Sequence, residues 1–421
     1  MNTLSESSIK RSRFLYILEA ALEYFISIAV TGSFLATLTK ELGLSDSLTG
    51  ILSAITSLGC LFQLFSLSIQ RARVKKFVIV FSMINQLLFL SFYVIPLTGF
   101  HSNIKISLFV IAICLAYLIY NIAHPKKTSW LMSLVDEHHR GIFTAHKEML
   151  SLVSGMLFSF GMGAVIDHFS SIGNIRTAFI LSAAVIFVLM ALHSLTMIFS
   201  VEPEMPQRPT KNMKEIIKGL VKNKRLLHIT VIFLLYYIST SVSTPFFGTY
   251  QINELGLNLK FISGIAIFGS VSRILVSKFW GNYADRKTFP VMVEKCFIFL
   301  AFAQVCVIFA VPSTGKLMFI LYSILHGIAM GGINSSLTNL IFECIPREQG
   351  ADALAVTHAC AGLTGFLTTL CISPLVSHIQ NNGNTLFGLN IYAQQVVTVI
   401  ALVFTLLLIC YIRRVFIKAK T

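Results

Sequence analysis

The chain has 421 residues, of which 55% are hydrophobic and only 12% are charged, and its mean hydropathy is +0.78. An ordinary soluble domain carries roughly 25% charged residues, so a soluble fold could not bury this much apolar surface. The net charge of +15 would suit a nucleic-acid partner, but the basic residues do not gather in one patch, and we expect no nucleic acid to bind.

Long apolar blocks separated by polar breaks run along the whole chain. Many reach about 20 residues, the length a helix needs to cross a hydrocarbon core of about 30 Å. The blocks predict twelve transmembrane helices. In chain order they lie near residues 14–39, 47–69, 77–97, 104–124, 147–167, 175–199, 228–250, 258–282, 291–312, 316–342, 352–379 and 388–412.

Two features divide this series of helices into halves. The polar segment 201–225, rich in proline and then in lysine, predicts a cytoplasmic linker with an amphipathic surface helix near Met213–Val221. The run ELGL at 41–44 recurs at 254–257, and the basic loops after the second and eighth spans fall in a comparable register. We therefore predict an all-α polytopic membrane protein with six-helix bundles at 1–200 and 226–421, joined by 201–225.

The distribution of basic residues predicts the topology. Of the 33 Lys and Arg residues, 26 lie in the tails and the even-numbered loops and only 5 in the odd-numbered loops. This count places Lys126 and Lys127 in the loop after the fourth span. Cytoplasmic loops are enriched in basic residues, so both termini are expected in the cytoplasm. A composition rich in Lys, Ile and Phe, with no cleavable signal, suggests a bacterial cytoplasmic (inner) membrane.

Glu19 and Glu23 in the first span are the most informative residues, because a charge within a span costs about 2.5 to 3.5 kcal/mol and commonly serves function. Their i, i+4 spacing places them on one helix face, where mutual repulsion favours a proton on one of them. We expect Glu23 to bind a proton or a polar substrate group, assisted by Glu19. Arg273, central in the eighth span, is the other charge near the bilayer midplane and needs a partner.

These charges also have structural interpretations. Glu19 can be an interfacial residue held by Arg11 or Arg13. Arg273 can be satisfied by backbone carbonyls or by Glu294 of the next span.

The end of the eighth span carries a family motif. Residues 279–287, FWGNYADRK, resemble the signature of the major facilitator superfamily, Gly-x-x-x-Asp-Arg followed by basic residues. The corresponding first-half run 67–76, LSIQRARVKK, keeps the basic residues but lacks the Gly and the Asp. The resemblance implies that Gly281, Asp285 and Arg286 form a cytoplasmic gate, in which we expect Arg286 to pair with Glu343. In this superfamily the first and eighth spans border the central cavity, so the resemblance also implies Glu23 as the partner of Arg273.

Polar and aromatic residues within the spans could line a substrate cavity. Tyr117 shares a helix face with Tyr120 or Asn121, which makes that cluster the better candidate. Histidines of the tenth and eleventh spans rank ahead of His193, because in this superfamily those spans normally border the cavity. The candidates are Gln63, Tyr117, Tyr120, Asn121, Tyr236, Tyr237, His326, Asn334, Asn339 and His358.

The sequence predicts a secondary active transporter that works by alternating access. No G-x-x-x-x-G-K-[ST] loop is present, so we expect no nucleotide or other cofactor, and proton coupling through Glu23 is the leading mechanism. Uptake of a small polar solute by a monomer in the lipid bilayer is favoured over efflux of amphiphilic compounds. The sequence is also compatible with facilitated diffusion and with a transporter-like sensor, whereas we predict neither an enzyme nor a metal site.

Overall fold

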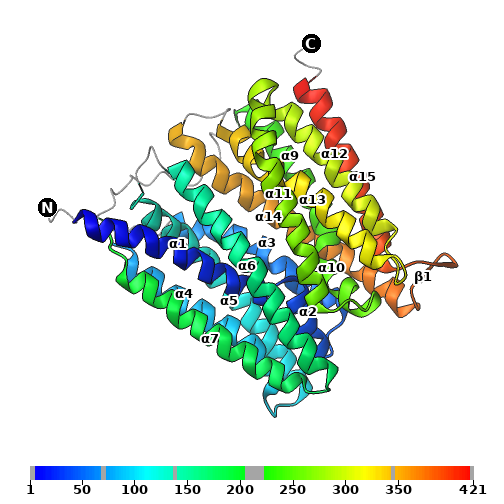
Figure 1. The fold of residues 1–421 in the computed structure, drawn as a ribbon. Coiled ribbons are helices and arrows are strands. Elements are labelled where there is room, and N and C mark those ends of the chain that lie inside the picture. The colour runs from blue at the N-terminus through cyan, green and yellow to red at the C-terminus, as the bar shows by residue number, and fades with distance from the viewer. Residues whose placement is uncertain (1–4, 68–72, 136–139, 204–221, 343–346, 418–421) are drawn as a thin grey trace. The chain divides into compact units, whose positions relative to one another are not determined.

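The computed structural model describes residues 5–67, 73–135, 140–203, 222–342 and 347–417 (Figure 1). The predicted surface helix at Met213–Val221 lies outside these residues. The first half holds the helices α1 (Glu6–Ala29), α2 (Gly32–Glu41), α3 (Asp46–Leu67), α4 (Lys75–Val94), η1 (Ile95–Leu97), α5 (Ser102–Met132), α6 (Arg140–Ser171) and α7 (Ile175–Phe199). The second half holds α9 (Lys224–Ser243), η3 (Thr244–Phe246), α10 (Phe247–Thr249), η4 (Tyr250–Glu254), α11 (Leu259–Arg286), α12 (Phe289–Ile308), α13 (Gly315–Phe342), α14 (Arg347–Asn381), the strands β1 (Thr385–Leu386) and β2 (Leu389–Asn390), α15 (Ala393–Ile412) and η5 (Arg413–Ile417).

Each predicted span overlaps a helix, but the count of twelve spans is not reached. Among the described residues, ten helices are long and apolar enough to cross a membrane, and α1 with α2 makes an eleventh if the pair forms one span. The predicted span at 47–69 coincides with α3, which is not one of these. The fold is therefore a mostly helical membrane-spanning bundle.

Two helices differ from their predicted bounds. The first predicted span is broken between α1 and α2, which meet at a bend of 41°, and Gly32 after the break has a positive φ of 55° that favours glycine. Helix α5 continues through Pro125 to Met132, because Trp130 and Leu131 near its end are buried in the core. Lys127, predicted in a loop, is consequently inside a helix.

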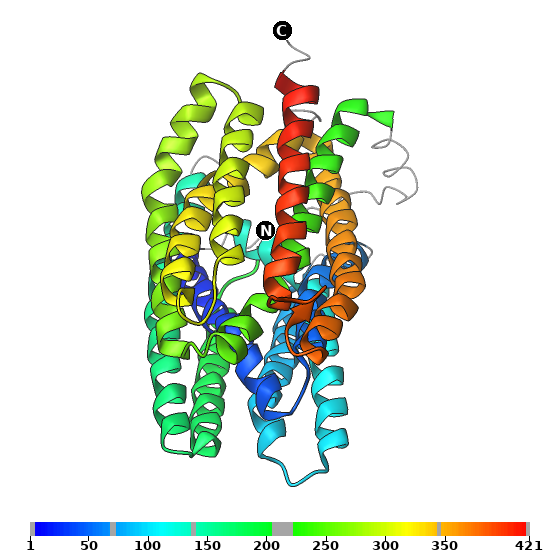
Figure 2. The ribbon, with the colours of Figure 1, turned by 90° about the vertical axis from the view of Figure 1, so that its right-hand side faces the viewer.

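The helices group into two compact units. Unit 1 comprises Met1–Leu44, Phe62–Thr210 and Asn258–Ser263. Within it, α1 packs against α6 and α7, and α4 packs against α5 and α7. The connections between α4 and α5 and between α6 and α7 lie at the same end of this unit (Figure 2). Its core contains Tyr16, Val74, Val78, Trp130, Leu131, Leu134, Val135 and Met197.

Glu202 fastens the end of α7 to the start of α4 in unit 1. Its carboxylate accepts hydrogen bonds from the backbone N–H groups of Val74 and Lys75, the latter at 2.8 Å. In return, Lys75 Nζ donates to the carbonyl oxygens of Ile198 and Ser200, both at 2.7 Å. The N-terminus of a helix leaves backbone donors unsatisfied, and a carboxylate satisfies them while matching the helix dipole.

Unit 2 comprises Ser45–Leu61, Lys211–Leu257 and Gly264–Thr421. Helix α9 packs against α14 and α15, and α12 packs against α13 and α15. Arg413 at the end of α15 forms an ion pair with Glu294 of α12. Helices α11 and α13 cross through small residues: a Cβ on Gly327 would overlap the backbone of Gly269, and one on Gly269 would lie 2.9 Å from the Ser323 carbonyl oxygen. This close approach agrees with the packing role of small residues in membrane helices.

We predict that Gly327→Ala destabilises unit 2, because the added methyl group must push α11 and α13 apart. Overpacking of this kind costs about 1 to 3 kcal/mol, which should lower the melting temperature in detergent by a few degrees. Gly281→Ala is the matched control, because a Cβ built there meets no described atom within 4 Å beyond its own stretch of helix. Equal melting temperatures for the two variants would contradict the prediction.

Candidate functional site

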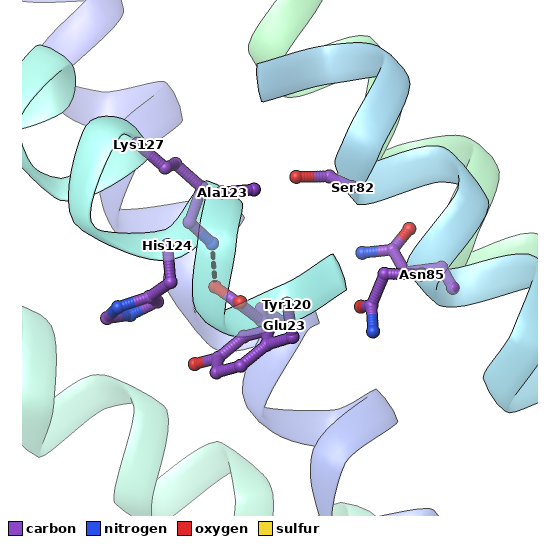
Figure 3. A pocket seen from close by; sticks show the side chains of 8 residues that line it. Glu23, Ser82, Asn85, Tyr120, Ala123, His124 and Lys127 are labelled. Carbon is purple, nitrogen blue, oxygen red and sulfur yellow. Dashed lines mark hydrogen bonds and ion pairs between the residues drawn. The ribbon is translucent and has the colours of Figure 1, made fainter. Parts of the chain in front are cut away.

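Three charged side chains meet inside unit 1. Lys127 of α5 donates to Glu19 Oε1 at 2.7 Å and also to a carboxylate oxygen of Glu23, the contact drawn as a dashed line in Figure 3. Glu19 and Lys127 are only 2% and 4% exposed, whereas the Glu23 side chain keeps 22% of its surface accessible. The predicted shared face of Glu19 and Glu23 is confirmed, since one ammonium binds both carboxylates.

His193 of α7 and Gln86 of α4 extend this cluster on the side of Glu19. The imidazole Nε2 lies 3.0 Å from Glu19 Oε1, and the Gln86 amide Nε2 lies 2.8 Å from His193 Nδ1. His193 is fully buried and Gln86 is 2% exposed. A continuous series of hydrogen bonds therefore links α4, α7, α1 and α5, and we call these five residues the charged cluster: Glu19, Glu23, Gln86, Lys127 and His193.

A small cavity borders the cluster at Glu23. Its volume is about 10 Å³, close to the space that one water molecule needs. Ser82 and Asn85 of α4 face Lys127 and Glu23 across it, and the Tyr120 ring lies beside the carboxylate (Figure 3). The lining residues are Glu23, Ser82, Asn85, Gln86, Tyr120, Ala123, His124 and Lys127. A proton or a water molecule that enters this cavity meets Glu23, the more accessible of the two carboxylates.

The spacing of the acidic groups and the imidazole would also suit a metal ion. One ligand atom from each of Glu19, Glu23 and His193 can be chosen so that all lie within 4.8 Å of one another. However, the Lys127 ammonium already binds both carboxylates. Lys127 thus supplies a positive charge at the position that a metal ion would need.

Within unit 1, the glutamates have partners that were not predicted. Glu23 pairs with Lys127, and Glu19 is held by Lys127 and His193 instead of Arg11 or Arg13. The reason is the extension of α5, which carries Lys127 into the core. The pairing of Glu23 with Arg273 of the other unit stays a prediction. The predicted ranking placed His193 behind the histidines of the tenth and eleventh spans, and it did not foresee the contact of His193 with Glu19. The sequence shows His193 only as a polar residue in an apolar span.

The remaining unit 1 candidates form a second polar contact beside the cluster. Gln63 Nε2 donates to Asn121 Oδ1 at 3.1 Å, and Asn121 Nδ2 donates to the Tyr117 carbonyl oxygen at 2.8 Å. The Tyr117 ring packs against Phe89, and among the described residues its hydroxyl has no hydrogen-bond partner. These residues join α3 to α5.

In unit 2 the candidates form an aromatic group with little charge. Tyr237 OH lies 3.4 Å from His358 Nδ1, and the rings of Tyr236 and Tyr237 meet edge to face. Arg273 lies close enough to Tyr236 and His326 to interact electrostatically with both. Its alternative partner, Glu294, binds Arg413 instead.

The predicted gate remains a prediction. Arg286 is exposed at the end of α11, and Gly281 has open space around it within 4 Å. Glu343 and the side chain of Asp285 lie outside the described residues, as do the side chains of the cavity candidates Asn334 and Asn339.

Comparison with known proteins gives a family and a fold. Residues 20–369 match the model of the Major Facilitator Superfamily. No curated protein matches the chain. The nucleoside transporter NupG has a similar solved structure, with a TM-score of 0.70 and 14% identity over 99% of this chain and 100% of that one. A POT family peptide transporter described as auto-inhibited has a TM-score of 0.69 and 13% identity over 96% of this chain and 97% of that one. A D-xylose-proton symporter has a TM-score of 0.64 and 14% identity over 95% of this chain and 97% of that one. These identities show a shared fold alone.

We predict that Lys127→Met strongly destabilises the protein, because it leaves two carboxylates buried without their counter-charge. Breaking a buried ion pair costs about 3 to 5 kcal/mol, which should greatly reduce the yield of monodisperse protein in detergent and its melting temperature. Lys126→Met, a change at the half-buried neighbour, is the matched control. Adding Glu19→Gln to Lys127→Met should restore part of the loss; a single variant as stable as the control would contradict the role of Lys127.

Proposed function

The chain belongs to the Major Facilitator Superfamily and is a membrane-spanning transporter rather than an enzyme, and we propose that it couples uptake of a small polar solute to proton entry through Glu23. The charged cluster of unit 1 is the single observation that carries this proposal. It provides a half-buried carboxylate, that of Glu23, which has a cation partner and borders a cavity.

The charge balance of the cluster explains why it would take up a proton. With a neutral imidazole, the two glutamates and Lys127 sum to a charge of −1. An uncompensated charge is costly in a low-dielectric interior. One proton on Glu23 brings the sum to zero. Lys147 of α6 approaches from outside the cluster, where its ammonium lies 3.5 Å from Tyr16 OH.

Proton binding at Glu23 would change how α1 contacts α5. An ionised Glu23 accepts a charge-assisted hydrogen bond from Lys127, whereas a protonated carboxyl loses the ionic part of that bond. Lys127 then keeps only Glu19 as its charged partner. The arriving proton thus alters the contact between two helices of the bundle, which is the requirement for biasing one state of an alternating-access cycle over another. No nucleotide or other cofactor takes part in this scheme.

The proposed solute is small and polar. Gln63, Asn121 and Tyr120 in unit 1, and Tyr237 with His358 in unit 2, offer hydrogen-bonding groups of the kind that orient such ligands. Solved structures with this fold include a nucleoside transporter and a xylose-proton symporter, so nucleosides and sugars are the first solutes to test. The excess of basic residues in the tails and even-numbered loops supports cytoplasmic termini, and we propose that a monomer works in the cytoplasmic membrane.

We predict that Glu23→Gln separates solute exchange from proton coupling. In proteoliposomes, the wild type should accumulate a nucleoside, sugar, amino acid or organic acid when a proton gradient is imposed, and an uncoupler should abolish the accumulation. The variant should still exchange labelled solute for unlabelled solute at equal pH but should lose gradient-driven accumulation, because a permanently neutral side chain cannot load or release a proton.

Glu148→Gln, at an exposed acid of α6, serves as the control and should behave like the wild type. Accumulation that survives in Glu23→Gln would refute coupling through this residue. Gradient-driven extrusion of amphiphilic dyes, without accumulation of any polar solute, would instead support efflux.

A further inference from the structure

His193 occupies an unusual position for an ionisable side chain, because both of its ring nitrogens are engaged while it is fully buried. Its Nε2 faces the Glu19 carboxylate at 3.0 Å and its Nδ1 faces the Gln86 amide at 2.8 Å. The proposed proton step at Glu23 does not involve the His193 imidazole. An imidazole can itself bind a proton, and no role has yet been given to that property.

One orientation of the Gln86 amide fits a neutral imidazole. When the amide nitrogen faces His193 Nδ1, it can only donate, so Nδ1 accepts and carries no proton. The remaining ring proton is then on Nε2, which donates it to Glu19. The ring is neutral in this arrangement, and both of its nitrogens are satisfied.

Gln86 has one further property. Its amide oxygen is buried and has no hydrogen-bond partner among the described residues. A half-turn of the amide group exchanges its oxygen and its nitrogen, which have nearly the same size. The oxygen would then face Nδ1 and could accept a proton donated from it, which is what a doubly protonated imidazolium requires. One side chain can thus serve both charge states of His193 without any movement of the backbone.

We propose that His193 is a second proton-binding residue of the transport cycle, and that Gln86 is the positioning residue that turns its amide to match each protonation state. The proposal rests on the proposed function, because it places a second proton position in the same charged cluster.

The charge balance supports this assignment. With Glu19 and Glu23 ionised and Lys127 charged, a proton on His193 brings the sum to zero, as a proton on Glu23 does. The two positions stand at opposite ends of one hydrogen-bonded series, in which Lys127 and Glu19 lie between Glu23 and His193. The cluster reaches neutrality with one proton at either end, so occupation of one end disfavours occupation of the other.

The neighbouring helices reinforce this limit of one proton. Among the described side chains that approach His193, α4 contributes the neutral Gln86, α1 contributes Glu19 and α5 contributes Lys127 through its contact with Glu19. From α6, Lys147 extends to Tyr16 and adds a positive charge at the edge of the region. A second proton would make the cluster positive, which is as costly in the interior as a negative sum.

The Gln86 amide also has space beside it. Gln86 lines the same water-sized cavity as Glu23. A turn of this amide therefore takes place at the wall of a cavity rather than inside a closed core.

The test measures the protonation of His193 directly, with histidine labelled at both ring nitrogens in full-length protein reconstituted in nanodiscs. The His193 signals are assigned by their loss in His193→Gln. We expect a neutral ring, protonated on Nε2, to convert to the imidazolium when the pH of the sample is lowered.

Two variants separate the contact with Gln86 from general electrostatics. In Gln86→Glu a carboxylate faces Nδ1, so the imidazolium signal should persist to a pH at least about 1 unit higher than in the wild type. Asn85→Asp is the matched control: it places a carboxylate at the wall of the same cavity, but Asn85 bonds to the Ala116 carbonyl oxygen and not to His193. Its effect should be clearly smaller.

Two results would overturn the inference. An imidazole that keeps one form from about pH 5 to 8 in both the wild type and Gln86→Glu could not bind a transported proton. Equal shifts in Gln86→Glu and Asn85→Asp would remove the positioning role of Gln86. Neither result depends on transport, so a failure here is distinguishable from a failure of Glu23→Gln to uncouple accumulation.

Discussion

The ammonium group of Lys127 is the constraint on which the rest of unit 1 depends. A charge inside a helical membrane bundle is tolerated when the protein supplies its counter-charge and fills its hydrogen bonds. Lys127 obtains both from Glu19 and Glu23, one turn apart on α1. Glu19 in turn needs a further donor, which is His193 of α7, and His193 needs Gln86 of α4. Polar contacts of one cluster thus hold four helices of unit 1 together.

Apolar block length was sufficient to predict most of the fold. In a transmembrane helix every backbone hydrogen bond is made within the segment itself. The position of an apolar run along the chain therefore predicts the position of a helix without knowledge of its neighbours. The bend in the first span and the extension of α5 could not be predicted from the length of the apolar runs. The bend between α1 and α2 depends on the backbone at Gly32, and the extension of α5 past Pro125 depends on what Trp130 and Leu131 contact in the folded unit. Both are tertiary effects that overrule a local signal.

The same distinction applies to the site. Glu19 and Glu23 could be found from the sequence, since acids within an apolar run are conspicuous and their spacing fixes their common face. Lys127 could not, because a Lys pair after Pro125 has the composition of a loop. His193 gave too weak a signal for a similar reason: a single histidine in a span is ambiguous until its neighbours on other helices are known. The half of the cluster that lies on one helix was predictable, and the half that depends on packing between helices was not.

The buried polar networks of the two units differ in charge, and this difference supports the place proposed for the proton step. In unit 2, the helices α9, α12 and α15 share a buried network in which Gln304 Nε2 donates to Ser239 Oγ at 3.1 Å and Thr405 Oγ1 donates to Gln304 Oε1 at 2.9 Å. Its members are neutral at any physiological pH, so it can hold helices together but cannot store a proton. In unit 1, the helices α1, α4 and α7 hold the corresponding places in the repeat predicted from the sequence, yet the network there carries two carboxylates, an ammonium and an imidazole. A network that serves only to hold helices gains little from buried charges, because neutral hydrogen bonds achieve the same without the desolvation cost. The charges of unit 1 are therefore best explained by a step in which their number changes, and that is the reason for placing proton coupling there.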